Sequence, residues 1–305
     1  MLSGHSHPAL GRRAEDEYKP ILAIQSGRPG QTPYFCIPGS GANVVDFLPF
    51  ASALGLQCCV YGLQARGMSG DFVPHGSVEI AARCYADEID RLYPVGAVHL
   101  VGHSFGGWIA YELAVRLRQR GREIASLNIF DSEAPTLSTR VGYKYTRPQA
   151  LMLLVSLYEQ AAEQAIGLVR EDFEGISFDA QLSILHKQLV RLNVLPKRSM
   201  PEHLRGTVRS FEANLRVKYK PTEAFCGRVR LVLARQYGES TDAMELRTKN
   251  TVPAWRLHAL QLESHIGDGN HVTLLKMPHI TNSVNWLLGR HGDAPQGGAR
   301  PGLVC

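Results

Sequence analysis

The chain has 305 residues, 44% of them hydrophobic and 20% charged, so it is long enough to bury one large core or two modest ones. Lysine and arginine exceed aspartate and glutamate by 33 to 28, but the formal charge of +5 is spread along the chain, which argues against nucleic-acid binding. Nowhere do about 18 apolar residues follow one another, so we expect no membrane-spanning helix.

The two ends of the chain and the cysteines bear on its location. Residues 1–19 are polar and lack the apolar stretch of a secretion signal, so we expect a flexible N-terminal segment. Residues 291–305 are rich in glycine and proline and predict a disordered tail. The six cysteines show no CxxC spacing, which predicts free thiols and no metal site. Together these features predict a cytoplasmic protein.

Short strand-like runs alternate with amphipathic helical patterns in the first half of the chain. Such alternation is typical of a mostly parallel, twisted sheet with helices on both faces. We therefore predict a single α/β domain over residues 20–290. The strand-like runs are 34–37, 58–61, 97–101 and 124–130, and the helical patterns are 44–54, 77–92 and 108–117.

The alternation of strand-like and helical patterns stops at residues 134–221. There, helical patterns follow one another at 148–162, 177–195 and 201–219. Strand-like runs then resume near 228–234 and 257–262, and a last helical pattern covers 272–288. We therefore predict a helical insertion within the domain. Placed above the carboxyl ends of the strands, where open α/β sheets bind ligands, it would act as a lid. The alternative is an insertion that only thickens the core.

The segment from Gly102 to Gly107 lies between a strand-like run and a helix, and it contains a serine flanked by glycines. This order is typical of a nucleophile elbow, the sharp strand-to-helix turn of α/β-hydrolases. Gly102 and Gly106 would give the turn its room, and Ser104 would stand exposed at the start of the helix. There the free amide of Phe105 faces whatever the serine attacks.

A serine nucleophile needs an imidazole as its base, and in this fold the chain order is serine, acid, histidine. His271 is the best candidate, because it lies in a glycine-rich loop that opens the last helix. His265 is a weaker rival in the same loop. His258 is expected in or beside a strand and His279 in a helix, where both would be structural.

Two carboxylates compete as the acid of the triad. Asp131 ends the strand that follows the elbow helix and so emerges at the same sheet edge as Ser104. Asp242 follows the next strand by several residues, where many α/β-hydrolases place their acid. A helix-capping role is the alternative for each, and position along the chain favours neither.

A second amide for an oxyanion hole is expected in the loop after the first strand-like run. The segment Ile37-Pro38-Gly39-Ser40-Gly41 can bring its backbone close to the serine, because its glycines carry no side chains. We choose the Gly39 amide as the partner of Phe105, with Ser40 next. The loop lacks the Gly-Lys-Ser/Thr ending of a nucleotide-binding turn, so we expect no nucleotide there.

Several of these segments together resemble the thioesterase domains that end nonribosomal peptide and polyketide synthesis, which are α/β-hydrolases. Residues 34–41 resemble their early oxyanion loop, 60–67 their V-Y-G-L-Q-x-x-G segment and 102–107 their elbow. The similarity runs over about residues 20–288. It implies Asp131 as the acid. It also shows two departures, Ile37 in place of a frequent histidine and His103 in place of a frequent tryptophan, which bear on substrate preference.

The resemblance implies that Ser104 attacks a thioester carried on the phosphopantetheine arm of an acyl or peptidyl carrier protein. His271 would move the protons, and the acyl-O-Ser intermediate would be released by hydrolysis or by macrocyclisation. Carrier proteins are usually acidic, which suits the mild positive charge. The enzyme would be freestanding or the terminal domain of a synthase, with no cofactor of its own. The alternatives are a carboxylesterase with the same triad and a noncatalytic binding scaffold.

Overall fold

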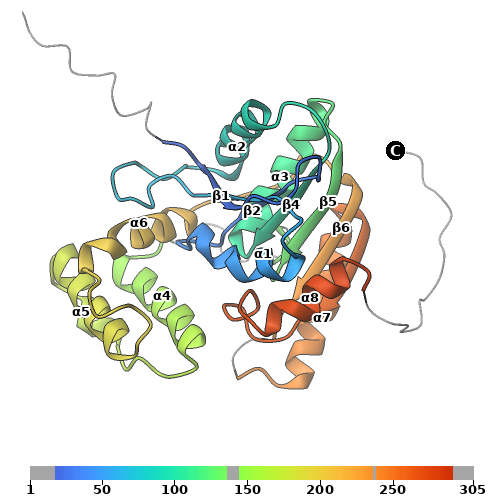
Figure 1. The fold of residues 1–305 in the computed structure, drawn as a ribbon. Coiled ribbons are helices and arrows are strands. Elements are labelled where there is room, and N and C mark those ends of the chain that lie inside the picture. The colour runs from blue at the N-terminus through green and yellow to red at the C-terminus, as the bar shows by residue number, and fades with distance from the viewer. Residues whose placement is uncertain (1–17, 136–143, 236–237, 291–305) are drawn as a thin grey trace, which may run out of the picture.

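The computed structural model describes residues 18–135, 144–235 and 238–290. The predicted flexible start and disordered tail fall almost wholly outside these residues. At the centre is a seven-stranded sheet in the order β1-β3-β2-β4-β5-β6-β7, parallel except for the antiparallel edge strand β1 (Figure 1). The strands are β1 Ile21–Gln25, β2 Tyr34–Ile37, β3 Val60–Leu63, β4 Val98–His103, β5 Ile124–Phe130, β6 Phe225–Leu233 and β7 Ala259–Ile266.

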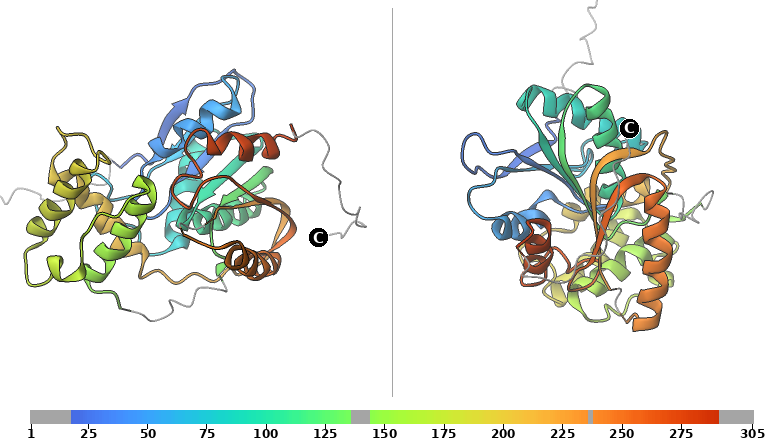
Figure 2. Two further views of the ribbon diagram at one scale, coloured as in Figure 1. Left: turned by 90° about the horizontal axis from the view of Figure 1, so that it is seen from below. Right: turned by 90° about the vertical axis from the view of Figure 1, so that its right-hand side faces the viewer.

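Helices cover both faces of the sheet (Figure 2). Apolar side chains of α2, α3 and α7 share one core with the sheet, whereas those of α1 and α8 share a second core on the other face. The α/β-hydrolase arrangement predicted from the alternating patterns is thereby confirmed. The helices are α1 Leu48–Leu54, α2 Val78–Leu92, α3 Phe105–Gln119, α4 Arg147–Ala162, α5 Phe178–Arg191, α6 Leu204–Asn214, α7 Thr241–Arg256 and α8 His279–Leu287, with 3-10 turns η1 Val44–Phe47, η3 Arg170–Phe173 and η4 Pro201–His203.

Local sequence explains where several helices begin. The Ser77 hydroxyl accepts from the Ile80 amide at the start of α2. Thr146 and Gln149 form a reciprocal capping box at the start of α4. Each cap satisfies amides that the first helical turn leaves without a helical partner. The central strands are apolar on both faces because helices cover both, and β2 is buried along its whole length.

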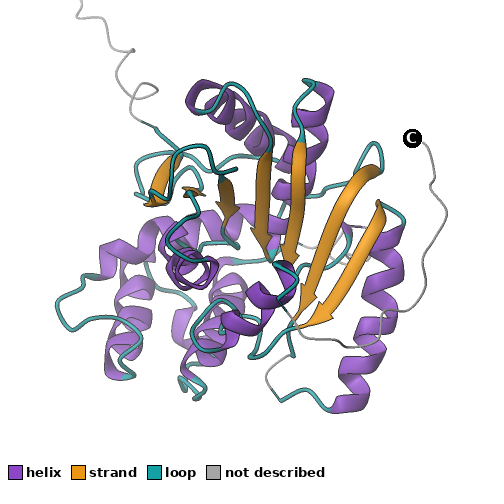
Figure 3. Ribbon diagram, turned by 45° about the vertical axis from the view of Figure 1, so that its right-hand side comes forward, coloured by secondary structure: helices purple, strands orange, loops and turns teal. Residues whose placement is uncertain are grey.

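The segment between β5 and β6 carries α4, α5 and α6, which we call the insertion. It has an apolar core of its own, in which side chains such as Leu151, Leu185 and Val208 are buried. The arrowheads of the strands point toward the side of the molecule that carries the insertion (Figure 3). The insertion therefore lies beyond the carboxyl edge of the sheet. None of the described helices is long and apolar enough to cross a membrane.

Four features differ from the sequence-based expectations. The edge strand β1 and the helix α7 were not predicted, because β1 is short and partly exposed and α7 contains polar residues and Pro253. The last helix begins at His279 rather than at residue 272. The last strand extends to Ile266, so His265 lies in β7 and not in the loop of His271.

Candidate active site

The turn between β4 and α3 holds Ser104 in an unusual backbone conformation, with φ of 54° and ψ of −127°. A positive φ is costly for a residue with a side chain, and it persists only where the surroundings enforce it. A Cβ on Gly102 would lie 2.7 Å from the Gly107 Cα, and one on Gly106 would lie 2.5 Å from the Pro38 carbonyl oxygen. The expectation that glycines make room for the elbow is confirmed.

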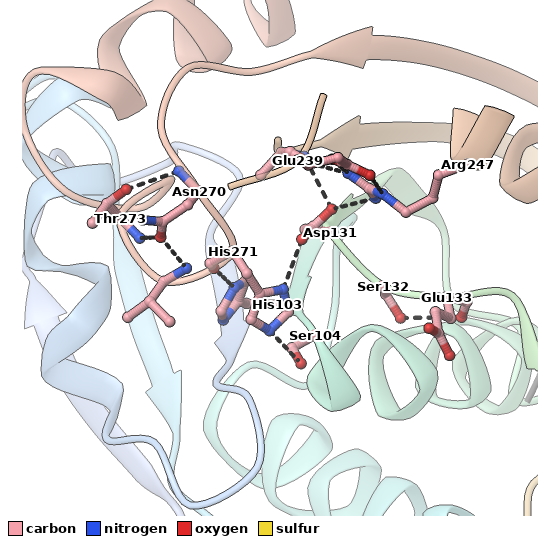
Figure 4. Close-up of polar contacts among 12 residues, drawn as sticks. His103, Ser104, Asp131, Ser132, Glu133, Glu239, Arg247, Asn270, His271 and Thr273 are labelled. Carbon is pink, nitrogen blue, oxygen red and sulfur yellow. Dashed lines mark hydrogen bonds and ion pairs between the residues drawn. The ribbon is translucent and has the colours of Figure 1, made fainter. Parts of the chain in front are cut away.

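His271 reaches Ser104 from the loop between β7 and α8 (Figure 4). Its Nε2 lies 3.0 Å from the Ser104 Oγ, and its Nδ1 lies 2.7 Å from Asp131 Oδ2. A carboxylate only accepts, so Nδ1 carries the proton that points to Asp131, and the neutral ring turns the lone pair of Nε2 toward the serine hydroxyl. The three side chains form one continuous hydrogen-bonded chain.

The other histidines considered as the base do not lie next to Ser104 and Asp131 in the structure. The His265 ring stacks on Trp286 with centroids 5.0 Å apart, and its position in β7 rules it out as a second histidine of the loop. The ring of His258 packs edge-on against Tyr111 just before β7. His279 is the first residue of α8. Of the candidates, the structure brings His271 to the serine.

Asp131 directly follows β5 and is almost wholly buried, its side chain 3% exposed. Its φ is 43°, and its amide donates to the Val232 carbonyl at 2.7 Å. Oδ1 accepts from the Ala234 amide at 3.0 Å. Burial acts to raise the pKa of this carboxyl, but the hydrogen bond and charge of His271, with smaller help from Ala234 and Arg247, hold the pKa below its ordinary value.

The rival carboxylate Asp242 does not join this group. It lies exposed in the first turn of α7, after Ser240, whose side chain caps that helix. An acidic residue in the first turn favours a helix because it faces the positive end of the helix dipole. Asp242 is therefore a first-turn residue of α7 and not its cap, and the structure brings Asp131 rather than Asp242 to His271.

Arg247 of α7 supports Asp131 from behind, and sequence reasoning missed it. Its guanidinium lies 3.4 Å from Asp131 Oδ1 and 3.0 Å from Glu239 Oε1, and it also donates to the Ala234 carbonyl (Figure 4). It thus ties Asp131 to the segment that follows β6. Because α7 itself was not predicted, the sequence offered no reason to place this arginine near the carboxylate.

His103 is a second residue whose place was not anticipated. It is buried, and its Nε2 lies 2.8 Å from the His271 carbonyl oxygen, to which it donates. Burial, followed by the neighbouring His271, lowers the pKa of His103 to about 4, so the ring is neutral at physiological pH. From the sequence we connected this departure with substrate preference, whereas in the structure it contacts the backbone of the histidine loop.

The two residues chosen for an oxyanion hole flank the serine. A Cβ on Gly39 would lie 3.2 Å from the Ser104 Cβ, so the loop after β2 packs directly against the elbow. Phe105 is the first residue of α3, where an amide has no carbonyl of its own helix to bind. The backbones of Gly39 and Phe105 therefore both lie beside Ser104, and their role as an oxyanion hole stays a prediction.

A buried carboxylate, an oriented imidazole and a serine hydroxyl in one chain are the parts of a serine hydrolase. A sequence model of the family described as thioesterase domain matches residues 32–286. The chain belongs to the thioesterase domain family. This confirms the resemblance seen in the sequence, and it makes the chain an enzyme of the thioester hydrolase class.

The curated relatives of this thioesterase domain are large synthetases. It is 29% identical over 167 residues to the nonribosomal peptide synthetase btyA of Aspergillus terreus, a match that covers 54% of this chain and 18% of that protein. It is 35% identical over 124 residues to malpibaldin synthetase of Mortierella alpina, which covers 41% of this chain and 2% of that protein. The matched part is thus less than a fifth of either relative's length.

Solved structures share the fold of this thioesterase domain. The Vlm2 thioesterase domain bound with a dodecadepsipeptide has a TM-score of 0.62 and 20% identity, over 90% of this chain and 99% of that one. The RedJ thioesterase from the prodiginine biosynthetic pathway of Streptomyces coelicolor has a TM-score of 0.58 and 21% identity, over 94% and 96%. At this identity the likeness shows the α/β-hydrolase fold.

Proposed function

We propose that Ser104, His271 and Asp131 are a catalytic triad that releases an acyl, peptidyl or polyketide chain from the phosphopantetheine arm of a carrier protein. The observation that carries the proposal is the unbroken chain of hydrogen bonds from Ser104 Oγ through both nitrogens of His271 to Asp131 Oδ2. It occurs in a chain of the thioesterase domain family, which supports a thioester as the bond attacked.

In the first half-reaction His271 Nε2 accepts the hydroxyl proton as Ser104 Oγ attacks the thioester carbonyl carbon. The carbonyl oxygen becomes an oxyanion, and we propose that the amides of Gly39 and Phe105 stabilise it. The packing of Gly39 against Ser104 and the position of Phe105 at the start of α3 support this role. The C–S bond then breaks, the carrier thiol leaves with the proton from His271, and the acyl group remains on the serine oxygen.

In the second half-reaction His271 takes a proton from a new nucleophile, which attacks the acyl-O-Ser carbonyl. Water gives a free acid, and a hydroxyl or amine of the chain itself gives a macrocycle. Ser104 recovers its proton when the ester C–O bond breaks. Protein, thioester and water or the chain's own nucleophile supply every group that reacts, so the scheme uses no cofactor of its own.

Asp131 keeps the imidazole in the productive tautomer and stabilises the positive charge that His271 acquires in each half-reaction. For this it must stay ionised. The lowered pKa of Asp131 supports this role, because burial alone would favour the neutral carboxyl. Arg247 adds a fixed positive charge on the far side of the carboxylate. We propose Asp131 as the acid of the triad and Arg247 as its support.

The partner we propose is an acidic carrier protein or carrier domain. Two observations support it: the relative btyA is named a nonribosomal peptide synthetase, and this chain carries a net charge of +5. Opposite net charges speed the encounter of two proteins and select the correct partner. The protein must be in the same compartment as its carrier protein, and we propose that this compartment is the cytoplasm.

The test is intact-protein mass spectrometry of the parent and of Ser104→Ala, each incubated with an acyl-loaded carrier protein. We expect the parent alone to remove the acyl group and to show a transient acyl adduct on itself. The mass of the product identifies an acid or a macrocycle. Cleavage of a simple oxyester without any action on the carrier would instead assign a carboxylesterase, and failure of a fluorophosphonate to label Ser104 would assign a binding scaffold.

A further inference from the structure

The end of α4 in the insertion is bonded to the loop that carries His271. Asn270 Nδ2 donates to the Gln160 carbonyl at 2.9 Å, and the Lys276 ammonium lies 3.5 Å from the Ala161 carbonyl oxygen. The last carbonyls of a helix have no helical donor and carry the negative end of its dipole. An amide and a cation therefore satisfy groups that α4 cannot satisfy itself.

The same asparagine also shapes the backbone around His271. The Asn270 Oδ1 accepts from the backbone amides of Val272 and Thr273 at 3.0 and 2.9 Å (Figure 4). The backbone amide of Asn270 donates to the Thr273 hydroxyl at 2.9 Å. Asn270 is 7% exposed. The Oδ1 atom of the side chain thus fixes the loop, and its Nδ2 atom bonds to the insertion. Both contacts are largely shielded from water.

At its other end the insertion meets the loop of the proposed oxyanion hole. A Cβ on Gly41 would lie 2.8 Å from the Thr207 carbonyl oxygen of α6, so the two backbones are in close contact. A Cβ on Gly206 would lie still nearer to the Met68 carbonyl oxygen in the loop after β3, so the backbones approach even more closely there. α6 is therefore held by backbone packing and by the Arg209 guanidinium, which donates to the Gly70 carbonyl at 3.2 Å. The described polar contacts from the histidine loop to α4 come from two side chains.

The insertion contacts the histidine loop through α4 and the Gly41 loop through α6, and these two helices are packed together. α4 and α6 share an apolar core, and the Arg147 guanidinium pairs with the Glu212 carboxylate at 2.8 Å. If α4 moves away from the site, it leaves the buried amide of Asn270 without its acceptor, which costs free energy. The same movement would therefore release the loop from its fixed position beside Ser104.

We propose that Asn270 is a positioning residue that latches α4 to the histidine loop, so that covering the substrate and placing the base occur in the same state. The inference rests on the proposed function only for the role of His271. A long chain on a carrier needs the insertion in place to be bound and shielded from water, whereas a small ester needs only the triad.

The sharpest variant is Asn270→Asp, which keeps the oxygen that accepts from Val272 and Thr273 but removes the donor to Gln160. Its matched control is Asn250→Asp, which adds the same charge at an exposed position of α7. A second variant, Lys276→Met, removes only the exposed cation, and Lys249→Met on α7 is its control.

The first readout is amide hydrogen exchange, which requires no substrate. We expect Asn270→Asp to speed exchange in the last turn of α4 by about threefold to tenfold, the effect of losing one hydrogen bond. Lys276→Met should act in the same direction with a smaller effect, and neither control should change exchange in α4. Unchanged exchange in α4 of Asn270→Asp would overturn the latch.

The second readout compares kcat/KM for a carrier-bound thioester and for p-nitrophenyl acetate, each on the pH plateau of the variant. We expect Asn270→Asp to reduce the thioester reaction at least fivefold more than the acetate reaction. Equal reductions would mean that Asn270 acts only on the loop, which overturns the proposal. If the parent cleaves no thioester at all, the proposed function fails, and hydrogen exchange still decides the latch.

Discussion

The Nε2 atom of His103 lies 2.8 Å from the carbonyl oxygen of His271, a residue 168 positions further along the chain. The residue before the nucleophile thus holds the backbone of the residue that is proposed to activate it. Because His103 precedes Ser104 directly, the elbow and the histidine loop share one hydrogen bond. Their relative position does not depend on the triad's own contacts alone.

We expect His103→Phe to lower kcat about tenfold and the free energy of unfolding by about 1–3 kcal/mol, because the His271 carbonyl loses a buried donor. Steady-state kinetics and urea denaturation check both values. His103→Gln retains an N–H donor and should recover part of each loss. If Phe and Gln behave alike, ring packing rather than the hydrogen bond is what matters at this position.

For Asp131→Asn we expect kcat/KM to fall by about 10⁴-fold, because an amide favours the wrong imidazole tautomer and brings no charge. Asp242→Asn, which changes an exposed residue of α7, should leave kcat/KM within twofold of the parent. Both are measured with the same thioester. A large loss in Asp242→Asn with little in Asp131→Asn would reverse the assignment of the acid.

The pH dependence of stability follows from the carboxyl of Asp131, whose pKa is lower in the folded than in the unfolded chain. Such a group favours the folded state above its unfolded pKa of about 3.9, and this stabilisation is lost as pH falls through the lower folded value. We expect the stability difference between the parent and Asp131→Asn to be constant near neutrality and to shrink below about pH 4. Urea denaturation at a series of pH values measures it.

Arg247→Met should raise the pKa of Asp131, because it removes a positive charge 3.4 Å from Oδ1. The stability that ionised Asp131 contributes should then be smaller, and its loss in acid should be complete at a higher pH than in the parent. The acid limb of kcat/KM is expected to move in the same direction if Asp131 must be ionised. Arg256→Met, at an exposed position of the same helix, is the control. An unshifted stability profile would show that Arg247 only packs beside the carboxylate.

Gly106→Ala should destabilise the fold by about 1–3 kcal/mol, because a methyl group there overlaps the backbone of the loop after β2. The same change at Gly76, where a Cβ would meet no atom within 4 Å, is the matched control. Thermal unfolding of the two variants makes the comparison. Similar melting temperatures would mean that the loop after β2 gives way without cost.

Much of the sheet was predictable, because parallel strands covered on both faces are apolar runs separated by helical patterns. β2 and β5 have the predicted bounds, and α2 begins one residue after the predicted start at its capping serine. β1 was missed because it is only five residues long and precedes the alternating strand and helix patterns, although its first four residues are apolar. α7 was missed because its polar sequence shows no clear amphipathic pattern.

The candidate site also contains residues that the sequence predicted and residues that it did not. Ser104 and His271 lie in local patterns, a glycine-flanked turn and a glycine-rich loop, that sequence alone reveals. Asp131 needed the resemblance to a family, since two carboxylates followed suitable strands. His103, Arg247 and Asn270 could not be assigned, because their contacts join segments far apart in the chain and no local pattern marks them.

The separate apolar core of the insertion has a consequence for how such an enzyme diversifies. Leu151, Leu185 and Val208 pack among themselves, away from the two cores that border the sheet. Substitutions at sites that share no contacts have nearly additive effects. Substitutions within the core of the insertion can therefore change the proposed cover of the substrate while the two cores that border the sheet, and the elements that carry Ser104, His271 and Asp131, stay unchanged.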